Sequence, residues 1–112
     1  MRIIFLLFIN IFTTYMLQAK DPLTKVSLEI KGNCGMCKKT IESAAKTDGV
    51  HKASWDKKTH ILELQFNPKI ISQDQIELRI AASGYDTPNY RANDSAYNSL
   101  HNCCKYPRDK KN

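Results

Sequence analysis

The sequence lacks the residue patterns that carry hydrolytic or phosphoryl-transfer chemistry. It has no Ser-His-Asp set, no glycine-rich phosphate loop and no paired carboxylates. It also lacks a stripe of interleaved aromatic and basic residues, although its formal net charge is +6, so a nucleic-acid partner is not expected. These absences predict a binding protein rather than an enzyme.

Long apolar runs are also missing, and the longest lies at the N-terminus. Ile3–Phe12 is broken only by Asn10 and is too short for a transmembrane helix, which needs roughly 20 apolar residues. Arg2 precedes the run and Ala19 is a small residue suited to cleavage, as in a secretory signal peptide. We therefore expect a signal peptide over residues 1–19, an exported chain and no stable membrane insertion after cleavage. An uncleaved anchor is the alternative.

Hydrophobic periodicity in the rest of the chain predicts a β-α-β-β-α-β order of elements. In chain order the expected elements are a strand at Lys25–Lys31, a helix at Lys38–Thr47, strands at Val50–Trp55 and His60–Phe66 joined as a hairpin, a helix behind the capping box Ser72-Gln73-Asp74-Gln75, and a short edge strand at Tyr85–Asn89. This order is typical of an α+β, ferredoxin-like fold, in which two helices cover one face of a four-stranded antiparallel sheet. The domain is expected to span residues 20–89, and residues 90–112 form a polar C-terminal extension with a His/Cys cluster.

The four cysteines form two close pairs. Cys34 and Cys37 are three residues apart, whereas Cys103 and Cys104 are adjacent. An exported chain favours disulfides, but a bridge within either pair would close a very small loop and restrict the unfolded chain little. Cross-pairing between the two pairs stays open, as do metal binding and redox chemistry.

Cys34 and Cys37 lie between a predicted strand and a predicted helix, where two sulfur atoms can face one point. Thiolates prefer soft ions such as Cu(I), Ag(I) and Hg(II), or Zn(II) with additional ligands. The free N–H groups and the positive dipole of a helix start favour the thiolate form of Cys37. Lys38 and Lys39 either offset the charge of two thiolates or are simply solvated.

The segment GNCGMCKKTIE (Gly32–Glu42), the later DGV and SGYD segments and the order of elements resemble the heavy-metal-associated domain. This is the family of small copper chaperones, metal-ATPase N-terminal modules and periplasmic mercury-binding proteins. The likeness covers Lys25–Asn89 and implies a ferredoxin-like fold in which Cys34 and Cys37 bind one soft ion. It also implies a tyrosine beside the metal loop, a position that Tyr85 matches.

The resemblance further implies a periplasmic or otherwise exported protein that passes its ion by ligand exchange. Cu(I) is the first expectation, and Hg(II), Ag(I) and Zn(II) are the alternatives. The expected partner is a metal efflux or acceptor protein. The main rival function is thiol-disulfide exchange, because CGMC is close to the CGPC of thioredoxin-like proteins. Asn33 in place of a tryptophan before Cys34, and the order of elements, favour metal binding.

One departure from the family concerns the loop. The family usually has Gly-Met-x-Cys-x-x-Cys, with the methionine packed under the loop. Here Gly32 and Asn33 precede Cys34, and Met36 lies between the cysteines. We expect Met36 to fold inward as packing, with a thioether ligand as the alternative.

A second cluster, His101, Cys103 and Cys104, follows the predicted domain. These residues are candidate additional ligands that either complete the site of Cys34 and Cys37 or form a second one. The run after residue 89 is long enough to return to the loop. The alternatives are a bridge between chains, which gives a metal-bridged dimer, and a disulfide within the tail.

Overall fold

Three antiparallel strands form a sheet in the order β1-β3-β2. The computed structural model describes residues 22–108, so the predicted signal peptide at residues 1–19 lies outside the described residues. The strands are β1 (Thr24–Glu29), β2 (Val50–Trp55) and β3 (Ile61–Phe66). Leu28 of β1 and Trp55 of β2 both lie opposite Leu62 of β3, so that the apolar side chains share one face. The first three predicted strands and the hairpin are confirmed.

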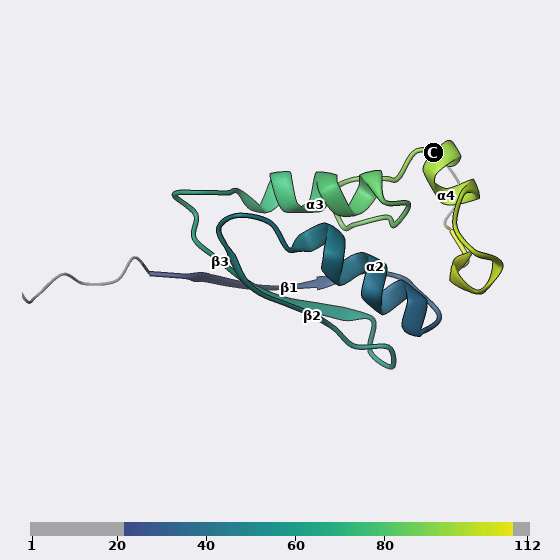
Figure 1. Cartoon of the computed structure of the whole chain (residues 1–112), viewed down its shortest axis with the longest axis horizontal. Helices are drawn as coiled ribbons and strands as arrows, with labels where there is room; N and C mark the ends of the chain where they lie inside the picture. Colours follow the sequence, from purple (N-terminus) through teal and green to yellow (C-terminus); the bar gives the residue numbers. More distant parts are fainter. Residues whose placement is uncertain (1–21, 109–112) are drawn as a thin grey trace, which may run out of the picture.

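Helices cover the apolar face of this sheet (Figure 1). These helices are α2 (Gly35–Ala45) and α3 (Gln73–Ala82). The tail that follows them contains the short helix α4 (Asp94–Asn98) and a 3-10 turn (Asn102–Cys104). Ile41 of α2 and Ile76 and Ile80 of α3 are fully buried and pack with the sheet in one core. No helix within residues 22–108 is long and apolar enough to cross a membrane.

The predicted capping box at the start of α3 is present. The Ser72 hydroxyl accepts a hydrogen bond from the Gln75 N–H at 3.2 Å, and the Ser72 N–H donates to the Gln75 side chain at 2.9 Å. These bonds satisfy backbone groups that a helix start leaves unpaired. The signal in the sequence therefore placed this helix correctly.

The predicted fourth strand at Tyr85–Asn89 is not formed, and this segment is irregular. Its backbone groups bond to side chains instead of a neighbouring strand. The Asp86 N–H donates to the Tyr106 hydroxyl at 2.8 Å, and the Asn89 N–H donates to the Glu77 carboxylate at 3.2 Å. Among the described residues the sheet therefore has three strands and ends at β1.

The chain after α3 turns sharply at Gly84 and brings the tail back against the domain. Gly84 has a φ of +108°, which favours glycine, and a Cβ there would lie 2.9 Å from both the Ala96 carbonyl oxygen and a Leu100 methyl group. Close contact between this turn and α4 therefore needs a residue without a side chain. Figure 1 shows α4 beyond the end of α3.

Tyr106 fastens the end of the tail to the core. Its side chain is buried, its hydroxyl donates to the Gly84 carbonyl at 2.9 Å, and its ring stacks on Tyr85 with centroids 5.7 Å apart. The Tyr97 hydroxyl donates to the Tyr106 carbonyl at 2.6 Å. A residue of the C-terminal extension is thus part of the hydrophobic core.

Arg108 adds an ion pair to this attachment. Its guanidinium donates to both carboxylate oxygens of Asp86, at 3.0 Å and 2.7 Å, and lies 4.7 Å from the centre of the Tyr97 ring. Burial alone would raise the pKa of the Asp86 carboxyl, but the hydrogen bonds from Arg108 and from the Ala92 N–H lower that pKa below its usual value. The pair is bidentate and largely shielded from water, a geometry in which such bonds are strong.

Replacing Arg108 with Gln should make the protein less stable above pH 5 and less sensitive to acid. Between the lower pKa of the folded chain and the usual pKa of about 4 in the unfolded chain, Asp86 is ionised only when the chain is folded. The ion pair therefore stabilises the fold fully above about pH 4, and this stabilisation is lost as pH falls through the folded pKa. We expect Arg108→Gln to lower the free energy of unfolding at pH 7 by about 2 kcal/mol. Denaturant titrations between about pH 2 and pH 7 measure both effects.

The matched control is Lys105→Gln, which removes an exposed cation from the same tail. It should leave the free energy of unfolding nearly unchanged, because exposed charges contribute little. An Arg108→Gln protein with the stability and acid sensitivity of the native chain would contradict this account of the ion pair.

Candidate metal centre

Cys34 and Cys37 start helix α2 and hold its first turn in place. Cys34 is the N-cap residue, and the side chain of each cysteine faces the backbone N–H of the other, in the manner of a capping box. The N–H groups of Asn33 and Cys34 both donate to the Cys37 sulfur at 3.4 Å. The two sulfur atoms are 3.4 Å apart. The loop therefore directs both sulfurs to one point and surrounds one of them with donors.

The tail brings the other two cysteines to the same place. The Cys34 sulfur lies 3.0 Å from that of Cys103 and 3.4 Å from that of Cys104. The sulfur atoms of Cys34, Cys37 and Cys104 all lie within 4.8 Å of one another. All four cysteines are free thiols, and we call these four side chains the thiol cluster. The structure thus joins the two cysteine pairs that the sequence separates.

The histidine of the second predicted cluster lies apart from the sulfurs. The His101 side chain is exposed, and its ring is not among the ligand atoms that lie within 4.8 Å of one another. Its backbone carbonyl accepts from the Cys104 N–H at 2.8 Å and so starts the 3-10 turn that carries the tail cysteines. Its part as a metal ligand stays a prediction.

The thiol groups of the cluster differ in acidity. The hydrogen bond from Cys103, followed by one from the Cys37 backbone, lowers the pKa of Cys34 to about 6. The same bond to Cys34 raises the pKa of Cys103, whereas burial, followed by the bond to Cys37, raises that of Cys104. Negative charge therefore collects first on the half-buried Cys34, at the boundary between the loop and the tail.

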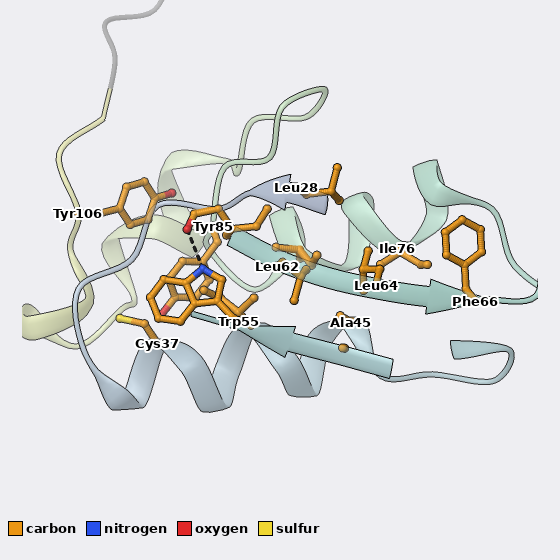
Figure 2. Packing of buried hydrophobic residues seen from close by; sticks show 14 of the residues in the cluster. Leu28, Cys37, Ala45, Trp55, Leu62, Leu64, Phe66, Ile76, Tyr85 and Tyr106 are labelled. Atoms are coloured by element: carbon orange, nitrogen blue, oxygen red, sulfur yellow. Dashed lines mark hydrogen bonds between the residues drawn. The ribbon is translucent and has the colours of Figure 1, made fainter. Parts of the chain in front are cut away.

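Tyr85 lies beside the cluster, at the position that the family resemblance implies. It is fully buried, and its hydroxyl has no hydrogen-bond partner among residues 22–108. Burial is the main cause that raises the pKa of this hydroxyl, and the neighbouring sulfurs of Cys37 and Cys104 raise it further. Figure 2 shows Tyr85, Trp55 and Tyr106 gathered near Cys37, at the opposite end of the core from Phe66.

The indole of Trp55 supports the loop from below. Its N–H donates to the Ile30 carbonyl at 2.8 Å, the dashed line in Figure 2. A Cβ at Gly32 would lie 2.9 Å from the indole ring and 3.2 Å from the Cβ of Cys37. Gly32 stands where the family pattern has methionine, so Trp55 occupies the space under the loop.

The expectation that Met36 packs inward is wrong. Met36 is 49% exposed, because it lies on the outer side of the first turn of α2 and Trp55 already fills the space below. Lys38 does not face the sulfurs either. Its ammonium group pairs with Glu42 and donates to the Trp55 carbonyl at 2.9 Å, which ties α2 to the end of β2.

Reasoning from the sequence missed the residues that position the cluster. Trp55 was expected as the end of a predicted strand, without a role in the loop, and Tyr106 and Arg108 were assigned to the polar extension. The one local signal was an aromatic residue close behind the tail cysteines, in the segment CCKYPR. Because the contacts of this residue, Tyr106, lie about twenty residues away at Gly84 and Asp86, no local pattern predicts them.

Several solved structures are similar to this chain, and three of them illustrate the match. The CopZ metallochaperone is 29% identical with a TM-score of 0.55, and the match covers 57% of this chain and 98% of CopZ. A copper binding domain from HMA7, a P-type ATPase, is 25% identical with a TM-score of 0.54, over 56% of this chain and 88% of that domain. The ZiaAN sub mutant is 35% identical with a TM-score of 0.52, over 59% of this chain and 96% of that protein. No family model and no curated protein matches the sequence.

Replacing Gly32 with Ala should destabilise the protein, whereas Gly35→Ala should not. The new Cβ at position 32 would push into the Trp55 indole, and overpacking of this kind costs about 1–3 kcal/mol. At Gly35, by contrast, a Cβ would meet no atom within 4 Å, and alanine favours the helix. Denaturant unfolding with Trp55 fluorescence measures both variants. Equal stabilities would show that the indole does not fill the space under the loop.

Proposed function

The chain belongs to the heavy-metal-associated domain family, and from this premise we propose that it binds Cu(I) through Cys34 and Cys37 and passes the ion to an acceptor protein. The observation that carries the proposal is the approach of the Cys34, Cys37 and Cys104 sulfurs to within 4.8 Å of one another. Thiolate sulfur is the ligand that Cu(I) prefers. A metallochaperone and a copper binding domain of a P-type ATPase among the similar structures support this choice of ion.

The loop offers one accessible and one buried sulfur, an arrangement suited to ligand exchange. Of the two loop sulfurs, that of Cys34 is half-buried and accessible to an incoming ion, whereas that of Cys37 is fully buried. The N–H groups that point at the Cys37 sulfur offset its negative charge. Within the loop, the bond from Cu(I) to Cys34 forms before the bond to Cys37, and the bond to the donor breaks as the ion passes to the loop.

Export of the protein is part of the proposal. This part rests on the sequence pattern of residues 1–19, which is typical of a signal peptide. An exported protein would lie in the periplasm or another external compartment. The protein that receives the ion is then a metal efflux protein, or another protein with thiolate ligands of its own. Hg(II) is the alternative cargo, because it shares the preference for sulfur.

Thiol-disulfide exchange is the second candidate function, and one distance favours it. The sulfur atoms of Cys34 and Cys103 are 3.0 Å apart, the shortest separation in the thiol cluster. A disulfide between them would need only a small further approach, because an S–S bond is about 2.05 Å long. Metal binding is the stronger candidate, because the Cys104 sulfur lies as close to that of Cys34, at 3.4 Å, as the Cys37 sulfur does.

Loss of the loop cysteines should abolish tight copper binding. We expect Cys34→Ser/Cys37→Ser to weaken the affinity for Cu(I) more than about a hundredfold, since even indirect partners of a metal contribute about 10–100-fold. Titration of the purified, fully reduced protein against a competing Cu(I) chelator, without oxygen, measures the affinity. Met36→Leu is the matched control, because it removes the other sulfur of the same loop, which is exposed.

Two results would contradict the proposal. One is tight Cu(I) binding that survives in the Cys34→Ser/Cys37→Ser variant. The other is a protein that does not bind Cu(I) and that catalyses the reduction of a disulfide substrate without metal. This result would favour thiol-disulfide exchange.

A further inference from the structure

The two adjacent cysteines of the tail lie in opposite surroundings. Cys104 is 2% exposed and belongs to the hydrophobic core, whereas Cys103 is exposed to solvent. Both sulfurs nevertheless lie within hydrogen-bond distance of the same atom, the Cys34 sulfur. A tail that served only to form a disulfide, or that carried thiols without a function, would not need one buried and one exposed sulfur.

We propose that the tail turns the loop into a three-sulfur site, in which Cys104 is a permanent inner ligand and Cys103 is the ligand through which ions enter and leave. The proposal rests on the function proposed above and specifies how that site works. The permanent ligands are Cys34, Cys37 and Cys104. The fourth thiol binds the ion only during transfer.

The geometry suits three sulfurs around one soft ion. Metal–thiolate bonds of about 2.3 Å at trigonal angles place the sulfurs about 4 Å apart. Cys34 lies 3.4 Å from both Cys37 and Cys104, and all three sulfurs lie within 4.8 Å of one another. Only small movements are needed for the three atoms to surround an ion, and two of the three are buried.

The hydroxyl of Tyr85 is an independent sign that anionic sulfur belongs at this place. It is fully buried, has no hydrogen-bond partner within the described part of the chain and lies next to the sulfurs of Cys37 and Cys104. A buried hydroxyl without a partner is costly, and buried polar groups nearly always have one. When metal replaces the thiol protons, the weakly accepting sulfur atoms beside this hydroxyl become stronger, anionic acceptors. Its missing partner is therefore supplied by the metal-bound state.

The position of Cys104 is fixed by the tail attachment just behind it. Tyr106, two residues further on, bonds through its hydroxyl to both the Gly84 carbonyl and the Asp86 N–H, at 2.9 Å and 2.8 Å. Ligands that are held in place before the ion arrives bind it more tightly than mobile ones. The exposed Cys103 has no such burial and can turn toward a partner.

The transfer step requires only ligand exchange. The Cys103 thiol loses its proton to water and its sulfur bonds to a Cu(I) ion that a donor thiolate holds. The bond from copper to the Cys34 thiolate then forms as the bond to the donor breaks, and the donor thiolate takes up a proton from water. The Cys37 and Cys104 thiols lose their protons to water as their sulfurs bond to copper. The bond to Cys103 breaks, its sulfur takes up a proton from water, and the copper stays Cu(I) throughout. Release follows the same steps in reverse.

Single substitutions of the two tail cysteines separate the roles. We expect Cys104→Ser to lower the Cu(I) affinity of the full chain by at least about tenfold, as loss of a fixed metal partner does. Cys103→Ser should change the affinity less than about threefold but slow the removal of Cu(I) by excess glutathione by about tenfold or more. X-ray absorption at the copper edge should count three sulfurs in the native and Cys103→Ser proteins and two in Cys104→Ser.

Two further variants guard against a fold defect. Cys104→Ala avoids placing a hydroxyl in the core and should bind Cu(I) as weakly as Cys104→Ser. Tyr106→Phe keeps all four cysteines but loses the bonds to Gly84 and Asp86, so it should also lose affinity. Thermal unfolding of each metal-free variant shows that the domain is folded at the temperature of the titration.

The outcomes distinguish this inference from the proposed function. Two sulfurs around copper in the native protein, four sulfurs, or equal effects of Cys103→Ser and Cys104→Ser on affinity would overturn the division of roles while Cu(I) binding itself stands. Failure of the native protein to bind Cu(I), or binding that survives Cys34→Ser/Cys37→Ser, would instead overturn the proposed function.

Discussion

The attachment of Tyr106 to the turn after α3 is the interaction on which the rest of the structure depends. Its hydroxyl accepts a hydrogen bond from the Asp86 N–H, in the segment where a fourth strand was expected, and donates one to the Gly84 carbonyl just before that segment. The Tyr106 hydroxyl thus bonds to a backbone group of this irregular segment and at the same time attaches the tail near the loop. The chain lacks this strand pairing but has a buried tyrosine, and Cys104, two residues before it, is also in the core.

A second constraint acts on the loop from the other side. The Trp55 indole fills the space beneath Gly32, and its N–H bonds to the Ile30 carbonyl at the end of the first strand. The Glu42 carboxylate accepts from the Trp55 N–H of the backbone at 2.8 Å and pairs with Lys38. Strand, helix and loop therefore share one support, and the cysteine loop is held between Trp55 below and the tail above.

The sequence predicts well those features that arise from neighbouring residues. Alternating apolar residues gave the first three strands, and Ser72 with Gln75 gave the start of α3, because both signals act within a few residues. It predicts poorly what depends on distant contacts. Met36 was expected to pack inward because nothing local reveals that Trp55 already fills the space, and the return of Cys104 depends on bonds of Tyr106 across about twenty residues.

The spacing of each cysteine pair suits the place where it lies. Residues three apart at a helix start point to the same side, so Cys34 and Cys37 direct two sulfurs to one point. Adjacent residues in a 3-10 turn point in directions about a third of a turn apart, so Cys103 and Cys104 face different surroundings. A C-x-x-C pair in the tail would place both sulfurs inside or both outside. An adjacent pair supplies one sulfur to the core and one to the surface, and both can still reach Cys34.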